Sequence, residues 1–258
     1  MYIVDAPPKK NKPVIIKKIK IESPFQKSKR IQTDYEAKLR GVSREVRKLI
    51  LAHNPVDLAS LERLKQALYS YAKLIEPWSK MIVEKMILDV SNQDKNAWRN
   101  HTKEMSLSLQ KEILNAPTGE IFRQLMEQNV ELIKSIPIEV AQKVHEKVIG
   151  NLGTGARPTS LIEEIMKMGG VTLGRATTIA RTETSRAANT LTQARAQFVG
   201  SEGYIWRTSK DLVVRLSHRK MNGVFVKWAE PPELDGMVGH AGCLPNCRCF
   251  SLPVIPEG

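Results

Sequence analysis

The clearest pattern of apolar positions in the chain lies between residues 61 and 82. Its members recur at steps of three and four, which places them on one face of an α-helix. They are Leu61, Leu64, Leu68, Tyr71, Ile75, Trp78 and Ile82. Pro77 falls inside the stripe and predicts a kink or a break, because its ring removes a backbone hydrogen bond. We expect the stripe to be buried in the protein's own helical core, with oligomerisation as the less frequent alternative.

Other helices are predicted on both sides of this stripe. A charged helical segment covers residues 33–53 and ends before Asn54 and Pro55. Further helical patterns follow at residues 95–114, 119–134 and 138–149. Pro117 and Pro137 predict the turns that separate these helices.

A glycine-rich stretch at residues 150–159 is the predicted boundary between two regions of the chain. We treat it as a hinge between a helical region at residues 31–149 and a C-terminal module at residues 160–258. Residues 1–30 form a separate basic arm, whose prolines block regular helix.

The module begins with two predicted helices. Ser160 and Glu163 form a capping box that opens the first helix, and Gly169 and Gly170 predict its end. The second helix begins after Thr172 and runs to about residue 199. Its candidate buried positions are Ala176, Ile179, Ala180, Ala187, Leu191, Ala194 and Phe198.

From residue 203 the pattern changes to short β-branched and aromatic segments, namely YIWRTS, DLVVRLSH and VFVKW. Asn222 and Gly223 are a strong turn signal between two of them. The sequence therefore predicts a mainly α protein with a small C-terminal α+β module. In it, long helices are followed by a short β-hairpin or small sheet and a Cys-rich loop.

Charge changes the picture at the N-terminus. The formal net charge is +13, and residues 1–30 alone carry nine basic and two acidic residues. The arm is either a solvated, disordered tail or a contact with a polyanion such as double-stranded DNA. In the second case the contacts are directed to phosphates and weakened by salt. The candidate nucleic-acid-binding residues are Lys9, Lys10, Lys12, Lys17, Lys18 and Lys20.

All three cysteines lie within residues 243–249. An odd number with no distant partner is not a disulfide framework, and it fits a reducing compartment. The sequence also has no apolar run long enough to span a bilayer and no signal-peptide pattern at its start. We expect a protein made in a bacterial cytoplasm, with no membrane association.

Four side chains near the C-terminus offer the nitrogen and sulfur donors of a tetrahedral zinc site. They are His218, Cys243, Cys247 and Cys249, with His240 as a spare. A small loop-rich module gains stability from such a clamp. The alternative is that the cysteines are small buried residues and that His218 is a hydrogen-bonded structural group.

Four charged residues are candidates for a buried polar network that ties the long helix to the sheet: Arg181, Glu183, Asp211 and Arg215. The alternative for Arg181 and Glu183 is a solvated helix face. Asp211, His218 and His240 activating a metal-bound water is a weaker catalytic interpretation, because no second carboxylate stands at a recognisable spacing. The sequence has none of the hydrolase, nucleotide-binding or zinc-protease motifs, so we expect no enzyme.

An ordered set of motifs covers residues 160–256. The set comprises ARTET at residues 180–184, then Arg186, Ala187, Asn189, Trp206, Asp211, Arg215, His218, Gly223, Cys247, Arg248, Cys249 and Pro253. Each motif is weak by itself, but in this order and spacing they are specific. The set resembles the phage head-morphogenesis family that takes its name from the Mu F protein.

The resemblance implies a minor capsid protein of a tailed phage or prophage, present in few copies and incorporated at head assembly. Its implied partners are the portal protein, the major capsid protein or both, together with the packaged DNA, and its implied location is the head interior or portal region. One alternative is a packaged effector enzyme, such as a nuclease or transferase, delivered with the genome. That enzyme would have to lie in the N-terminal helices, which show no acid/base constellation. A further alternative is a cellular zinc-containing nucleic-acid binder.

Overall fold

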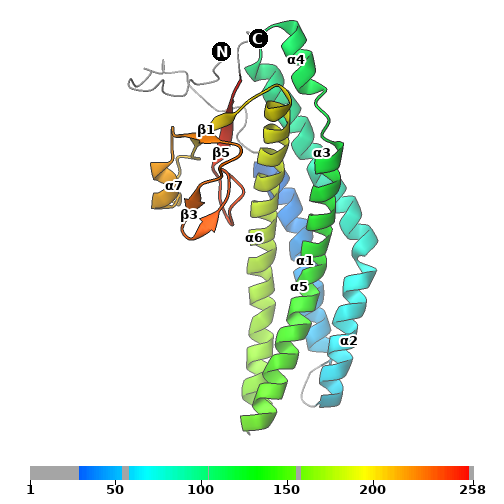
Figure 1. Ribbon diagram of the computed structural model, residues 1–258. Helices are drawn as coiled ribbons and strands as arrows, with labels where there is room; N and C mark the ends of the chain where they lie inside the picture. Colours follow the sequence, from blue (N-terminus) through cyan, green and yellow to red (C-terminus); the bar gives the residue numbers. More distant parts are fainter. Residues whose placement is uncertain (1–28, 54–57, 104, 155–157, 256–258) are drawn as a thin grey trace. The chain divides into compact units, whose positions relative to one another are not determined.

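The computed structural model describes residues 29–53, 58–103, 105–154 and 158–255 (Figure 1). The helices are α1 (Lys29–His53), α2 (Leu58–Leu74), α3 (Glu76–His101), α4 (Leu107–Leu114), α5 (Gly119–Thr154), α6 (Pro158–Phe198) and α7 (Leu216–Lys220). The strands are β1 (Gly203–Arg207), β2 (Phe225–Lys227), β3 (Glu233–Leu234), β4 (Met237–Val238) and β5 (Phe250–Val254). The predicted fold class, mainly α with a small C-terminal sheet, is confirmed. Residues 1–28, which include most of the predicted basic arm and all six candidate nucleic-acid-binding lysines, lie outside the described part of the chain.

The chain divides into two compact units, each discontinuous in sequence. The first contains Ile87–Leu125 and Arg181–Gly258, and the second contains Gln32–Met86 and Met126–Ala180. The predicted hinge at residues 150–159 falls where α5 ends and α6 begins. The domain division drawn at that hinge stays a prediction.

The second unit is built around the apolar stripe of α2. Its core also receives side chains from α1 and α5, and its buried members are Val46, Ile50, Leu61, Leu64, Leu68, Val140, Ala141 and Val144. The predicted burial of the stripe within the protein's own helices is thus confirmed. The predicted break at Pro77 is confirmed as well, because α2 ends at Leu74 and α3 begins at Glu76. Pro77 therefore occupies the first turn of α3, where its missing N–H costs no hydrogen bond.

Two predicted breaks between helices are wrong. Pro137 lies inside α5, and Gly169 and Gly170 lie inside α6. Proline and glycine lower helix propensity, but at Pro137 the burial of flanking residues outweighs this local preference. Around Pro137, for example, Ile133, Ile136, Val140 and Ala141 are all buried.

The predicted helix at residues 95–114 is instead two helices. The hydroxyl of Thr102 donates to the Trp98 carbonyl after the end of α3. Ser106 then caps α4 by accepting a hydrogen bond from the Leu109 amide. A Ser side chain that accepts from the amide three residues on is a common helix start.

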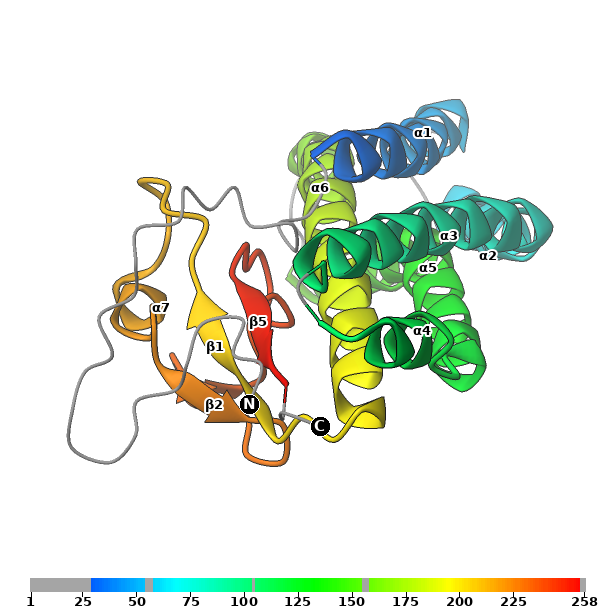
Figure 2. The ribbon, with the colours of Figure 1, turned by 90° about the horizontal axis from the view of Figure 1, so that it is seen from above.

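The sheet of the first unit has the strand order β2-β1-β5, with both neighbours antiparallel to β1. Seen from above, β5 is the strand nearest α6 (Figure 2). Tyr204, Ile205 and Trp206 of β1 are all buried, and the Tyr204 ring lies 4.4 Å from that of Trp228. The central strand is therefore covered on both faces.

The predicted strand DLVVRLSH is wrong, because these residues form a turn and α7. The Asp211 carboxylate accepts from the Val213 amide at 3.2 Å, which favours a turn over an extended strand. Leu212, Val213 and Leu216 are left exposed. The Asn222 and Gly223 turn exists, with Gly223 at φ +90°, but it connects α7 to β2 and does not join two strands.

A buried ion pair holds three helices of the first unit together. Arg195 of α6 donates through Nε to the Asp94 carboxylate of α3 at 2.8 Å, and both side chains are at most 3% exposed. Arg195 also donates to the carbonyls of Ile113 and Leu114 in α4. Thr192 donates to the other Asp94 oxygen at 2.6 Å. Burial raises the pKa of Asp94 to about 6, and the bonds from Thr192 and Arg195 oppose that shift.

Arg195 was not among the predicted buried positions of the long helix, since apolar spacing cannot identify a buried charge. Ala176, Ile179, Ala180, Ala187 and Leu191 are buried as predicted. The prediction is wrong for Phe198, which is exposed. The chain turns at Gly200, and this end of α6 presents Arg195 and Ala196 to the core.

We predict that Asp94→Asn lowers the free energy of unfolding by about 3–5 kcal/mol, because it leaves the Arg195 charge buried and uncompensated. Urea unfolding followed by tryptophan fluorescence measures the change. Glu84→Gln, on an exposed position of the same helix, is the matched control and is expected to change stability by less than about 0.5 kcal/mol. Equal midpoints for the two variants would contradict a structural role for the pair.

Candidate metal centre

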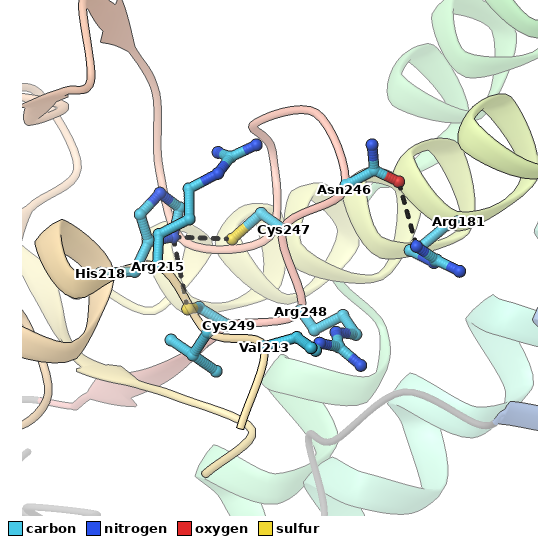
Figure 3. Close-up of a pocket in the computed structure, with 9 residues that line it drawn as sticks. Arg181, Val213, Arg215, His218, Asn246, Cys247, Arg248 and Cys249 are labelled. Carbon is cyan, nitrogen blue, oxygen red and sulfur yellow. Dashed lines mark hydrogen bonds between the residues drawn. The ribbon is translucent and has the colours of Figure 1, made fainter. Parts of the chain in front are cut away.

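Three side chains of the first unit converge on one buried point. His218 comes from α7, and Cys247 and Cys249 come from the loop that precedes β5. Nδ1 of His218 lies 3.3 Å from Sγ of Cys247 and 3.6 Å from Sγ of Cys249 (Figure 3). The three potential ligand atoms all lie within 4.8 Å of one another. One nitrogen and two sulfurs at this spacing could hold a metal ion.

The His218 ring contacts Trp206 and lies near Asp235. The indole of Trp206 meets it edge to face, with ring centroids 5.6 Å apart. On the other side Nε2 lies 4.0 Å from the Asp235 carboxylate, which also accepts from the Ser217 hydroxyl at 2.8 Å. That distance is too long for a hydrogen bond, and Nε2 has no hydrogen-bond partner among the described residues. Nδ1 is the ring nitrogen that faces the two sulfurs.

Asp235 reaches this place through a tight hairpin between β3 and β4. Asp235 and Gly236 both have positive φ, at 55° and 74°, as a type I′ turn requires. The Asp-Gly dipeptide is a recognised signal for that turn. Sequence reasoning treated this segment as a loop and missed Asp235, although this signal could have found it.

The cysteine loop is anchored on α6. The Asn189 side chain accepts from the Ser251 amide at 2.9 Å and donates to the Ser185 carbonyl. The Thr182 hydroxyl accepts from the Asn246 amide at 3.0 Å. Asn246 has φ 57°, so the loop turns sharply immediately before Cys247. The helix that carries ARTET thus fixes the loop that carries the two thiols.

The two thiols differ in acidity because they contact each other. A hydrogen bond from the Cys249 thiol lowers the pKa of Cys247, and the same bond raises the pKa of Cys249, which burial raises further. The pair therefore favours one thiolate that accepts from one thiol. A thiolate is the form of cysteine that binds metals.

Cys243, predicted as the fourth ligand, does not belong to this group. Its carbonyl accepts from Arg186 at 3.1 Å, and burial raises the pKa of its thiol to about 12. The spare, His240, uses one ring nitrogen toward the Tyr204 hydroxyl and the other toward the Trp228 carbonyl. The structure thus brings together three of the four predicted metal ligands.

The three potential ligands line a cavity of about 130 Å³. Its other lining residues are Arg181, Val213, Val214, Arg215, Asn246 and Arg248. Figure 3 shows the Arg215 side chain beside His218, and Arg181 at the Asn246 end of the pocket. None of the described residues that line it is a carboxylate, so the pocket offers positive charge and metal ligands but no general base of that type.

The predicted polar network is distributed over other partners. Arg181 donates to Asn246 at 3.3 Å, and Arg215 donates to the Pro245 carbonyl at 2.9 Å. Asp211 pairs with Arg248 at 2.8 Å. These three residues therefore all contact the cysteine loop, through partners that sequence reasoning did not assign to them.

Glu183 is buried. The alternative prediction, that Glu183 lies on a solvated helix face, is therefore wrong. Its carboxylate pairs with Arg186 at 2.9 Å. Burial raises the pKa of Glu183, and Arg186 opposes that rise. The same Arg186 bonds the Cys243 carbonyl, which links this pair to the loop as well.

Residues 142–252 match a family model described as "Phage Mu protein F like protein". This region of the chain is similar to the phage Mu F-like family. The match covers the ARTET helix, Trp206, His218 and all three cysteines, and it confirms the resemblance drawn from these motifs. The Mu F-like family is one of structural head-morphogenesis proteins of phages.

A curated relative is an "Uncharacterized protein" of Haemophilus influenzae (strain ATCC 51907 / DSM 11121 / KW20 / Rd). It is 34% identical over 157 residues, which are 60% of this chain. The chain spans about a third of the length of that relative, since the match covers 34% of it. No solved structure matches the chain. Among the helices of the described residues, none has the length and apolar character needed to cross a membrane.

We predict that Gly242→Ala destabilises the Mu F-like region by about 2 kcal/mol more than Gly236→Ala. Both glycines have positive φ, at 77° and 74°, so both substitutions strain the backbone by similar amounts. Only at Gly242 would the new Cβ collide with the Asn189 amide and lie 2.8 Å from the Cys249 carbonyl oxygen. At Gly236 no atom lies within 4 Å.

Thermal and urea denaturation of the two variants measure the difference. A difference is expected because the collision must displace either α6 or the cysteine loop. If both variants unfold at the same midpoint, the close approach of this loop to Asn189 is not a constraint on the fold.

Proposed function

We propose that this protein is a minor head protein of a tailed phage or prophage and that it acts in head assembly, genome packaging or ejection. The Mu F-like region carries this proposal, because that family is one of phage head morphogenesis. The motif residues of the resemblance also converge in space. Asp211, Arg215, His218 and the Cys-Arg-Cys sequence surround one pocket or bond to its lining, which is expected if they maintain one shared structure.

The proposed partners are the portal protein, the major capsid protein or both, and packaged double-stranded DNA. Support for the DNA contact comes from charge alone: residues 1–30 carry nine of the 40 lysines and arginines of the chain. Lysine-rich segments bind the phosphates of DNA independently of base sequence, and salt lowers their affinity. We place the protein in the virion, in the head interior or at the portal.

We also propose that the metal is zinc, bound by His218, Cys247 and Cys249. In a tetrahedral site with the usual Zn–N and Zn–S bond lengths, nitrogen and sulfur ligands stand about 3.6 Å apart. The two nitrogen–sulfur distances here are 3.3 and 3.6 Å. Binding would join α7 to the loop before β5, two segments held in the described structure by few regular hydrogen bonds, and would stabilise the module.

The effector-enzyme alternative has one observation in its favour: three protein ligands facing a cavity are also the arrangement of catalytic zinc sites. Such sites pair the metal with a general base that can take a proton from bound water. Here the nearby carboxylates have other partners, since Asp211 bonds Arg248 and Asp235 bonds Ser217. We therefore favour the structural role.

The test of the head-protein proposal is the composition of the particles. We predict that particles released by induction of the prophage that encodes this chain contain the protein in few copies per head, detectable by mass spectrometry after gradient purification. Deleting the gene should reduce the yield of DNA-filled heads. Purified particles without the polypeptide would contradict the proposal.

The test of the zinc proposal is metal analysis of ligand variants. We predict about one zinc per chain by plasma mass spectrometry after dialysis, and a loss of at least about 100-fold in affinity in His218→Gln, Cys247→Ser and Cys249→Ser. Cys243→Ser is the matched control and should keep its metal. If that control lost zinc as fully as the others, Cys243 would be a ligand and the three-ligand site would be wrong.

A further inference from the structure

The three-ligand site leaves one tetrahedral position to a group from outside the protein. Zinc with four protein ligands is closed, whereas zinc with three keeps an open position. His218, Cys247 and Cys249 all line the cavity, so the open position faces a space of about 130 Å³. That space accommodates a small anion or several water molecules.

The chemistry of the cavity wall selects the ligand. Zinc with two thiolates and a neutral imidazole carries no net charge, while the wall adds the guanidiniums of Arg181 and Arg215, and that of Arg248, whose charge the Asp211 carboxylate offsets. Arg215 bonds a neutral carbonyl, that of Pro245, through one Nη. A guanidinium has five N–H donors in a planar fork, which suits an oxyanion. The pocket therefore favours a negatively charged oxygen ligand.

The segment 211–216 forms one wall of the pocket and carries exposed apolar side chains. Val213, Val214 and Arg215 line the cavity. Leu212, Val213 and Leu216 of the same segment are 93%, 71% and 73% exposed. Apolar side chains beside a basic pocket match an acidic residue flanked by apolar residues in a protein partner. A phosphodiester backbone would gain little from them, because its contacts are with cationic and polar groups.

We propose that this pocket binds a glutamate or aspartate side chain of a partner protein, with the carboxylate on the open metal position and on Arg215 and the neighbouring apolar residues on Leu212, Val213 and Leu216. The inference rests on the proposed zinc site and goes beyond the head-protein proposal by naming the surface that docks. A metal at this position would have two roles in head assembly. It would stabilise the fold of the C-terminal module, and it would bind the carboxylate of the partner protein directly.

The test uses the full chain with cobalt in place of zinc, because cobalt bound by thiolates has visible bands that respond to its fourth ligand. The probes are two capped tripeptides, one with glutamate between two leucines and one with glutamate between two serines, together with acetate and inorganic phosphate. We expect all carboxylates to shift the bands and the leucine peptide to bind about tenfold more tightly than the serine peptide.

Arg215→Gln should lower the affinity for the leucine peptide about tenfold. Lys220→Gln, on an exposed position of α7, should change that affinity less than twofold. The cobalt spectrum without peptide checks that each variant retains the site.

The outcomes separate this inference from the zinc proposal. If the wild-type chain develops no thiolate-to-cobalt bands, the zinc site is wrong and this inference falls with it. If the bands appear but no carboxylate shifts them, the fourth position is closed and only this inference is overturned. Phosphate binding more tightly than the leucine peptide would overturn the protein partner and assign the pocket to a phosphate ligand.

Discussion

The contact of the His218 ring with two thiols is the interaction on which the C-terminal module depends. It joins α7 to the loop before β5, two segments with no strand pairing between them, and it creates the cavity beside them. The Trp206 indole packs edge to face on this ring, and Asp235 lies 4.0 Å from its Nε2. A metal bound there would replace a weak S–H hydrogen bond with coordinate bonds and would increase the rigidity of the same geometry.

The long helix α6 provides the frame for this contact. Thr182 and Asn189 bond the backbone of the cysteine loop and of β5, and Arg186 bonds the carbonyl of Cys243. Six residues after Asn189, Arg195 forms the buried pair with Asp94 that secures α6 to α3. The polar residues of ARTET and its continuation are therefore mostly buried and engaged in bonds, which explains why a helix with so many polar side chains is part of the core of its unit.

Local signals predicted some parts of this fold and failed at others for identifiable reasons. The three-and-four stripe from Leu61 onward, the break at Pro77 and the strand at YIWRT were predictable, because burial and backbone geometry there follow from neighbouring residues. Pro137 was misread as a helix end, because the burial of residues around it outweighs its local cost. Gly169 and Gly170 were misread as well, and they lie inside α6 although Val171 beside them is exposed. DLVVRLSH has the composition of a strand, but Asp211 turns the chain and leaves its apolar residues in solvent.

The sequence by itself determined the fold class, the similarity of residues 142–252 to the Mu F-like family and the residue types of a candidate metal site, since each depends on composition, order and spacing along the chain. Only the tertiary structure decided which donors meet. It placed His218 with Cys247 and Cys249, excluded Cys243 from the group, and brought in Asp235 and three arginines. Coordination and charge pairing depend on distances of a few ångströms between residues up to 101 positions apart in sequence, and no local pattern encodes those distances.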